Sequence, residues 1–360
     1  MAFAASVGRV FPPPPYLALP GAGVDVSAGS VRAIAFGWRG VPAVVLCEKV
    51  GLPEGVVVGG EIEKPDALVD VLRTFRLKHR IRFAHASLPE RKAFLYQTLV
   101  PSGEHDLRGA VEFDLEAHVP IPPAEAVFDF EPVRRVEAGT VVSVTAYALR
   151  VVESYRDAFR RAGIAVLSFE VESQAIARSI IAPDDRGHTI LIVDFGRLTT
   201  RIAIADHGVA AFTATIDVGG DALTAAVMKH FKVEAPEAET IKNERGFLEG
   251  AENRELYEAL MTTVSVLKDE ITKHIAYWGS TDDAVPRQAV DRILVVGGNA
   301  NLKGLPEYLS RVTALPVKVA NVWTNAFSLD NYVPAIAREA SLEYATAAGL
   351  ALRARPTTPW

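Results

Sequence analysis

The sequence has little cysteine, no long hydrophobic run and no surplus of basic residues. Cys47 is the single cysteine among 360 residues, which excludes an intrachain disulfide and a metal site built on cysteines. Its apolar neighbours, residues 43–46, predict a buried small side chain, and a reducing cytoplasm is the expected compartment. The formal net charge of −6 disfavours general binding of polyanions, so no nucleic-acid partner is predicted.

Signals for secretion or membrane anchoring are also missing. No apolar run approaches the roughly 20 residues that cross a bilayer. Near the N-terminus the only cation, Arg9, follows the apolar residues, and Pro12–Pro15 come next, which disfavours a signal peptide. Segment 353–360 is short and not amphipathic, so no direct membrane anchor is expected. The eight histidines show no paired metal-ligand spacing, and no G-x-S-x-G nucleophile motif occurs.

What the sequence does contain is a distinctive stretch at residues 190–208. The apolar run Ile190–Val193 predicts a buried strand that ends in Asp194. A turn with a glycine and two threonines follows, then a second β-branched run and a hairpin turn at 206–208. A carboxylate at a strand end can hold Mg²⁺ through water, while glycine and hydroxyl groups suit a phosphate. A hairpin with a polar tip and no ligand is the alternative for this segment alone.

A second copy of the pattern, at residues 23–36, favours the ligand-binding interpretation. It contains an apolar strand, Asp25, small and hydroxyl residues with a glycine, and then Arg32 at the start of another apolar strand. Two such turns in separate halves of the chain predict two phosphate-binding hairpins across a cleft. The pattern resembles the actin-like ATPase superfamily. The resemblance implies an α/β fold with duplicated actin-like, ribonuclease H-like domains around a nucleotide cleft.

The pattern of predicted strands and helices changes between residues 90 and 164, which predicts a small α/β insert in the first domain. The stretch Glu112–Pro122 (EFDLEAHVPIP) resembles the corresponding stretch in the insert of the PilM family, actin-like type IV pilus assembly proteins related to FtsA. Four later stretches match in order: residues 216–224, 238–244, 270–278 and 293–300 with 304–305. The resemblance covers roughly residues 17–352. The expected divisions are an extended segment 1–19, a first actin-like domain 20–89 and 165–186, the insert 90–164, a second actin-like domain 187–352 with a helical subdomain at 225–289, and the tail 353–360.

The resemblance implies a site for ATP or ADP with Mg²⁺. Asp25 and Asp194 would hold the metal, through water, and the remaining residues would line the phosphates, ribose and adenine. The residues carried over for nucleotide binding are Asp25, Ser27, Gly29, Ser30, Arg32, Asp194, Gly196, Thr199, Thr200, Gly219, Gly220, Glu239, Lys242, Gly297, Gly298 and Asn299. The helix after Gly220 would point its N-terminus toward the phosphates. Empty turns kept for folding, and a solvated Glu239–Lys242 ion pair, stay open as alternatives.

No catalytic residue is evident. Glu170 and Glu172, which enter the connecting helix, could approach a γ-phosphate, but a role as connector carboxylates with surface contacts is preferred. At most a slow ATPase is therefore expected.

The leading functional hypothesis is a cytoplasmic, ATP-binding scaffold of the PilM type. The family resemblance implies that its partner is the N-terminal cytoplasmic peptide of a PilN-like inner-membrane protein. That peptide would be held in a groove between the first domain and the insert, and would recruit the chain to the inner face of the inner membrane. Alternatives are an FtsA-like division or secretion scaffold and a small-molecule kinase on the same fold. Homo-oligomerisation stays open.

Overall fold

The computed structural model describes residues 21–38, 40–104, 106–280 and 285–355. The predicted extended segment 1–19 and most of the tail 353–360 lie outside the described residues.

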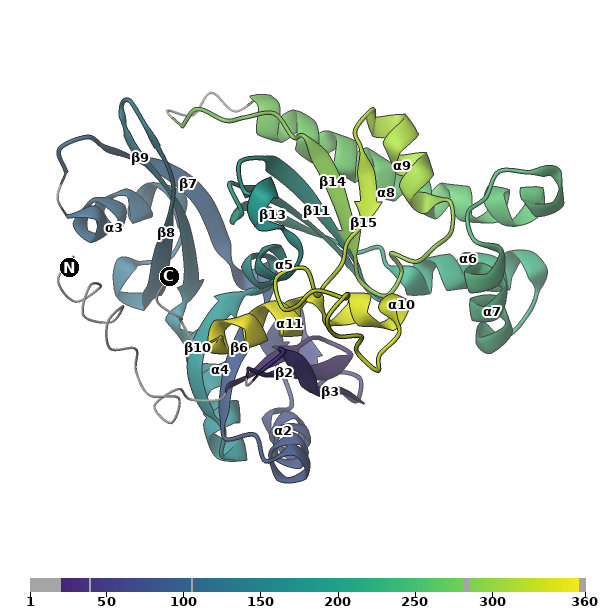
Figure 1. Ribbon diagram of the computed structural model, residues 1–360, viewed down its shortest axis with the longest axis horizontal. Coiled ribbons are helices and arrows are strands. Elements are labelled where there is room, and N and C mark those ends of the chain that lie inside the picture. Colours follow the sequence, from purple (N-terminus) through teal and green to yellow (C-terminus); the bar gives the residue numbers. More distant parts are fainter. Residues whose placement is uncertain (1–20, 39, 105, 281–284, 356–360) are drawn as a thin grey trace.

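Two five-stranded sheets form the centre of the molecule (Figure 1). The first has the order β10-β6-β1-β2-β3 and the second the order β15-β14-β11-β12-β13. The strands of the first sheet are β1 (Gly21–Val26), β2 (Ser30–Gly37), β3 (Ala43–Gly51), β6 (Phe83–Leu88) and β10 (Ala165–Val171). Those of the second are β11 (Thr189–Phe195), β12 (Thr200–Asp206), β13 (Val209–Ile216), β14 (Arg292–Val296) and β15 (Val317–Val319).

The two sheets repeat one topology. In each, a central strand (β1 or β11) pairs antiparallel with the next strand of the chain, which pairs antiparallel with the one after it. On its other side the central strand pairs parallel with a later strand, which pairs parallel with the edge strand. The central strands are buried along their whole length, as their apolar runs predict. This repeat confirms the predicted duplication.

Helices cover both sheets. They are α2 (Pro65–His79), α4 (Leu149–Ala162), α5 (Glu172–Ile180), α6 (Gly220–Phe231), α7 (Ala235–Arg245), α8 (Arg254–Ser280), α9 (Leu305–Thr313), α10 (Arg338–Ser341) and α11 (Ala345–Ala351). A short hairpin of β4 (Val57–Val58) and β5 (Glu61–Ile62) precedes α2. Helix α4 ends as its sequence predicts, because Gly163 adopts φ 80° and its N–H donates to the carbonyl groups of Arg160 and Phe159.

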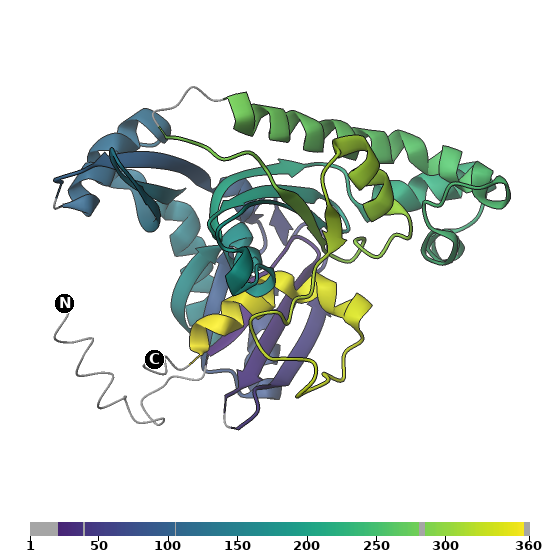
Figure 2. The same ribbon diagram turned by 45° about the horizontal axis from the view of Figure 1, so that its top comes forward.

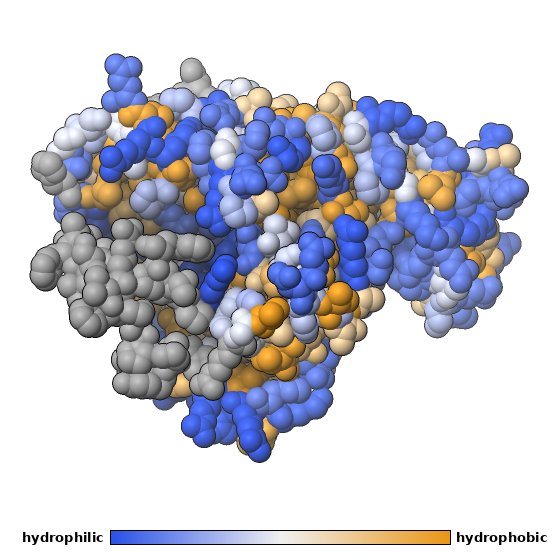
Figure 3. Space-filling model, viewed as in Figure 1, coloured by the Kyte–Doolittle hydropathy of each residue, from blue (hydrophilic) through white to orange (hydrophobic). Residues whose placement is uncertain are grey.

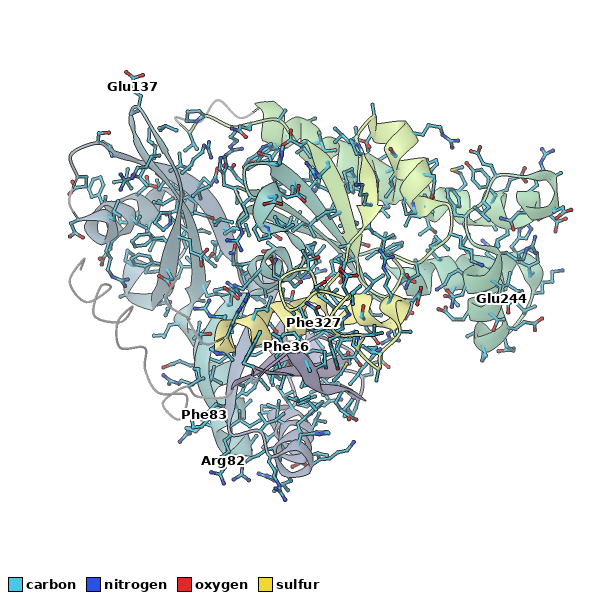
Figure 4. The ribbon with its side chains drawn as sticks, in the orientation of Figure 1. Phe36, Arg82, Phe83, Glu137, Glu244 and Phe327 are labelled. Atoms are coloured by element: carbon cyan, nitrogen blue, oxygen red, sulfur yellow. The ribbon has the colours of Figure 1, made fainter. Side chains whose placement is uncertain are left out.

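A third sheet, with the order β7-β9-β8, lies between β6 and β10 in the chain. It consists of β7 (Phe94–Pro101), β8 (Ala126–Val136) and β9 (Gly139–Ala148), and helix α3 (Leu107–His118) packs against it. Polar contacts join this sheet to the second one: Gln97 and Arg134 both donate to the fully buried carboxylate of Asp206. Figure 4 labels Glu137 at the tip of the β8–β9 turn and Glu244 on α7 at the opposite end of the molecule.

The surface over the α6–α7 end is largely hydrophilic (Figure 3). In contrast, the middle of the molecule contains a core that runs from the second sheet to β2 and α11. Phe36 of β2 lies edge-on to Phe327, with 6.3 Å between the ring centroids (Figure 4). This core therefore joins residues that are about 290 positions apart in the chain.

The last helix, α11, packs against β1, β2 and α5, so the end of the predicted second domain lies on the first sheet (Figure 2). Glycine makes the close contact possible at two positions. A Cβ on Gly23 of β1 would overlap the carbonyl oxygen of Ala347, and a Cβ on Gly349 would overlap the carbonyl oxygen of Ala175 in α5. Backbone on both sides leaves no flexible side chain to move away.

Replacing Gly349 with alanine should therefore destabilise the protein by about 1–3 kcal/mol, the usual cost of overpacking a core. The measurement is the midpoint of urea unfolding. Gly279→Ala is the control, because a Cβ at that position in α8 meets nothing within 4 Å. Equal midpoints for the two variants would show that α11 is not packed as described.

Candidate functional site

The turns of the two hairpins, β1–β2 and β11–β12, face one cleft of roughly 340 Å³. Most of the predicted binding residues line it: Asp25, Ser27, Gly29, Ser30, Arg32, Asp194, Gly196, Thr199, Gly220, Glu239, Lys242, Gly297, Gly298 and Asn299. Two predicted residues lie beside the cleft instead. The fully buried Thr200 donates its hydroxyl to the carbonyl of Val218 at 2.6 Å, and Gly219 packs against the backbone of Arg197.

Each hairpin places an arginine directly across from its aspartate. Asp25 of β1 is opposite Arg32 of β2, and Asp194 of β11 is opposite Arg201 of β12. Arg32 lies 3.4 Å from Asp25 Oδ2. Arg201 donates from both Nε and Nη2 to Asp194 Oδ2, the first of these bonds being 3.0 Å long. Both predicted metal carboxylates are therefore paired with a guanidinium group.

Arg201 also reaches Glu172 at the start of α5, with 2.5 Å between Nη1 and Oε2. Burial opposes the charge on this arginine, but the carboxylates of Asp194, Glu172 and Asp25 raise its pKa well above the usual range. Burial disfavours the charged form of Glu172 as well. It raises the pKa of Glu172 to about 8, although the charge of Arg201 acts in the opposite direction. A raised pKa is expected for Glu172, because the single guanidinium of Arg201 pairs with two carboxylates while Asp25 and Glu90 add further negative charge.

On the first hairpin, Arg32 has one free donor. Its Nη1 lies 3.3 Å from the hydroxyl of Ser27, and its Nη2 lies 3.5 Å from Glu343 Oε2, which also accepts from Lys49 at 2.5 Å. Its Nε is buried and has no partner among the described residues. A buried donor without a partner is costly, which points to a ligand in the cleft.

The turns themselves offer further donors. The backbone N–H groups of Ala28, Gly29, Arg197 and Leu198 have no acceptor in the part of the chain that the structure describes. Consecutive free N–H groups in a turn form a binding site for an anion such as phosphate.

Helix α6 does not point free N–H groups at the cleft as predicted. The N–H of Gly220 donates to the carbonyl of Gly196 at 3.0 Å, and that of Asp221 donates to the carbonyl of Arg197 at 2.9 Å. The second hairpin turn thus caps the helix. The start of α6 lines the cleft through Gly220 and Asp221, so its contact with a phosphate stays a prediction, while its first N–H groups hold the turn in place.

The Glu239–Lys242 ion pair is solvated on one side only, because Lys242 is buried while the side chain of Glu239 is 49% exposed. The ammonium group of Lys242 is buried and donates to Glu239 Oε2 at 2.7 Å and to the hydroxyl of Thr224 at 3.0 Å. These bonds lower the pKa of Glu239 although burial raises it. Asn299 accepts from Lys242 at 3.3 Å and donates to the carbonyl of Gly196 at 2.9 Å, which links α6 and α7 to the second hairpin.

The hydrogen-bond donors of the cleft fit a nucleotide better than its carboxylates fit magnesium. Free turn N–H groups and Arg32 Nε suit phosphate oxygens, and a side chain at Gly298 would point into open space in the cleft. Magnesium bound through water needs carboxylate oxygens that are free to accept from that water. Here Asp25 Oδ1 accepts from Ser87 at 2.9 Å, Asp25 Oδ2 faces Arg32, and Asp194 Oδ2 accepts twice from Arg201. Both oxygens of Asp25 are therefore occupied, whereas Asp194 Oδ1 has no partner among the described residues and is the one carboxylate oxygen of the pair left to accept from water on a metal.

Of the two weak catalytic candidates, only Glu172 contacts a residue of the cleft. Glu170 lies in a second groove, of roughly 520 Å³, between β8 of the insert and β10 of the first sheet. Its carboxylate accepts from Arg178 at 2.5 Å and from Arg353 at 2.8 Å. Glu170 is therefore buried and paired with two arginines outside the cleft, and it does not make the surface contacts that the sequence interpretation expected.

Five charged residues of the cleft are not among those predicted from the sequence: Lys49, Arg197, Arg201, Asp221 and Glu343. A signal for Arg201 is present, because it follows Asp194 by the same seven positions by which Arg32 follows Asp25. For Lys49 and Glu343 no local pattern exists, since they come from β3 and from the turn before α11.

A comparison with protein families agrees with this architecture. The family model described as type IV pilus assembly protein PilM matches residues 23–355. The chain belongs to the PilM family. It is also similar to the cell division protein FtsA of Pseudomonas aeruginosa, with 31% identity over 101 residues that make up 28% of this chain and 24% of that protein.

Solved structures show the same fold. The PilM chain of a PilM–PilN type IV pilus biogenesis complex matches with a TM-score of 0.75 and 22% identity, over 94% of this chain and 99% of that one. MreB5 of Spiroplasma citri bound to AMPPNP matches with a TM-score of 0.54 and 14% identity, over 92% and 95% of the two chains. The predicted actin-like fold is thus confirmed. Among the described helices, none combines the length and the apolar character needed to cross a bilayer.

The raised pKa of Glu172 predicts a pH-dependent stability. Unfolding returns this pKa from about 8 toward its usual 4.5, so between these values the unfolded state releases the proton first. The contribution of Glu172 to stability is therefore complete below pH 4.5 and is lost as the pH rises to 8. Glu172→Gln should reduce the loss of urea-unfolding free energy between pH 5.5 and pH 8.5. Glu307→Gln, on the exposed side of α9, should retain the full loss; the idea is wrong if both variants behave alike.

Proposed function

We propose that the chain binds ATP or ADP in the hairpin cleft and acts as a scaffold of a type IV pilus assembly platform. The observation that carries the nucleotide proposal is the set of unpaired donors on both turns, together with the buried Nε of Arg32. The phosphate oxygens of a polyphosphate would accept charge-assisted hydrogen bonds from these donors. The fold likeness to MreB5 bound to AMPPNP supports the same assignment.

The base and ribose would lie toward the second domain. Gly297 and Gly298 let the backbone approach a ligand, and Gly297 needs glycine because it has φ 90° and packs against Asp194. The buried Lys242, with its partners Glu239 and Asn299, makes a polar wall on that side. Such a wall is pre-organised, which favours binding of a polar ligand.

Hydrolysis would be slow or absent in this proposal. Glu172, the candidate from the sequence that contacts a residue of the cleft, is held by Arg201 and cannot orient water while that bond persists. We also propose the domain division predicted from the sequence, because each sheet is contained within one of the predicted parts.

Replacing Gly298 with leucine tests the nucleotide site. Its Cβ would meet nothing within 4 Å, so the side chain should fill the cleft without disturbing the fold. We expect at least tenfold weaker binding of ATP by isothermal titration calorimetry, with an unchanged unfolding midpoint. Gly279→Leu, on the exposed side of α8, is the matched control. Unchanged affinity in Gly298→Leu would place the nucleotide elsewhere.

We propose that the second groove holds the N-terminal cytoplasmic peptide of a PilN-like membrane protein. The groove is lined by β8, β9 and β10, with apolar side chains such as Val127, Phe130 and Phe169. Within the described part of the chain, β8 and β10 are edge strands of their sheets, so their outer edges offer backbone groups to an extended peptide. The likeness to the PilM–PilN complex supports this partner. Such a partner would keep a cytoplasmic chain at the inner face of the inner membrane.

The groove and the cleft share helix α5. Glu170 and Gln174 line the groove, while Glu172 between them pairs with Arg201 at the cleft. A ligand that moves Arg201 would therefore act on the same helix that borders the peptide. This supports coupling between nucleotide and peptide binding.

Val127→Lys tests the groove. The side chain of Val127 is 40% exposed, so a lysine there should leave the fold intact but place a charge in an apolar contact. We expect at least tenfold weaker binding of a synthetic PilN-type N-terminal peptide by calorimetry. Val45→Lys on β3, where the valine is 67% exposed, is the control. If the two variants bind the peptide equally well, the groove is not its site.

A further inference from the structure

We propose that the end of the first sheet at which β6 and β10 begin is a docking surface for the anionic lipid headgroups of a membrane. This basic end consists of one exposed leucine, Leu77, and six cations: Arg76, Lys78, Arg80, Arg82, Arg160 and Arg161. The choice of a membrane as the partner rests on the proposed binding of a membrane protein's peptide. To that tether the basic end adds a direct contact with lipid.

Positive charge is concentrated at this end although the chain as a whole is acidic. The formal net charge is −6, yet residues 73–82 contain five lysine and arginine residues and no carboxylate. The C-terminus of a helix favours cations within its last turn, which accounts for Arg76 and Lys78 in α2. It does not account for Arg82, which lies three residues past the end of the helix. The charge of this segment therefore exceeds what the helix alone would favour.

Folding brings the end of α4 beside the end of α2. Arg76 Nε donates to the carbonyl of Gly163 at 3.0 Å, and the N–H of Ala165 donates to the carbonyl of Arg82 at 2.9 Å. The last turn of α4, which carries the other two arginines of the basic end, directly precedes Gly163. Figure 4 labels Arg82 at the lower end of the molecule, away from Glu244 on α7.

Half of the six cations have no carboxylate partner. Three of them form ion pairs, which are Lys78–Glu48, Arg160–Asp157 and Arg161–Asp66. The other three, Arg76, Arg80 and Arg82, pair with no carboxylate in the part of the chain that the structure describes. Arg80 and Arg82 are also exposed, so the basic end presents net positive charge to solvent. Near an anionic membrane, each such cation strengthens binding by about fivefold.

Two observations favour a membrane over another polyanion. The first is Leu77, which is 65% exposed between Arg76 and Lys78, because an apolar side chain among cations can enter the headgroup region of a bilayer. The second is the nearby groove proposed for the peptide. Ser168 lines that groove and lies three residues after Ala165, roughly 10 Å along β10. A membrane protein whose peptide is bound there would hold the basic end close to lipid headgroups.

The test is flotation of the full chain with vesicles of phosphatidylethanolamine and phosphatidylglycerol, compared with vesicles of phosphatidylcholine. We expect binding to the anionic vesicles alone, and weaker binding as the NaCl concentration rises, because salt screens exposed charges. The double variant Arg80→Glu, Arg82→Glu should lower the partition coefficient at least tenfold. Lys229→Glu with Lys232→Glu is the matched control, because both lysines are exposed at the end of α6 and Lys232 has the same φ, 56°, as Arg80.

Leu77→Gln separates lipid from other polyanions. It keeps the charge and should weaken binding to the anionic vesicles at least threefold, because it removes apolar surface from the contact. Leu248→Gln, at a leucine that is 45% exposed, is the control and should bind as the wild type does. Binding of a duplex DNA oligonucleotide that depends on Arg80 and Arg82, with vesicle binding unchanged in Leu77→Gln, would overturn the assignment to lipid.

No binding to anionic vesicles, or equal binding by the arginine variant and its lysine control, would also overturn the inference. Because the vesicles contain no protein, this result is independent of the peptide groove. A chain that binds the PilN-type peptide but not the vesicles would leave the proposed function standing without the lipid contact. A chain that binds the vesicles but not the peptide would overturn the groove and leave the basic end as a membrane-binding surface.

Discussion

The antiparallel register of the two hairpins is the constraint on which the cleft depends. Because Asp25 faces Arg32 and Asp194 faces Arg201, each buried carboxylate meets a cation from the neighbouring strand. Without that pairing, the carboxylates at the strand ends would be left as uncompensated buried charges. The same pairing bears on which ligand the cleft can accept, since it leaves turn N–H groups free, occupies both oxygens of Asp25 and leaves Asp194 Oδ1 without a partner among the described residues.

Much of the fold is predictable because it is local. The apolar run before Asp194 and the turn at 206–208 predict β11 and β12, and the spacing of apolar residues at 66–80 predicts α2. Repetition of the hairpin pattern then predicts the duplication, because each copy follows the same rules of strand and turn. The glycines of the cleft were predictable for a similar reason, since a turn restricts which residue can occupy it.

The charged contacts were harder to predict, because they join segments that are far apart in the sequence. Lys242 can be buried because Thr224 and Asn299 accept its hydrogen bonds. Glu170 is held outside the cleft by its bond to Arg353. Arg201 is the exception: its seven-residue distance from Asp194 was visible, but only the register shows that the distance means direct opposition. Local patterns predict helices and strands, whereas contacts between residues far apart in the sequence can be identified only from the folded structure.

The packing of α11 on β1 also governs the order in which the protein can be completed during synthesis. Strand β1 is among the first described residues to leave the ribosome, and α11 is among the last. One face of the first sheet thus stays uncovered until nearly the whole chain has been made, because Gly23 has no packing partner before residues 347–351 arrive. Contacts of such sequence separation slow folding. The first sheet therefore acquires its final packing only after α11 has been made, and a ribosome stalled before residue 345 would hold an apolar surface open to chaperones.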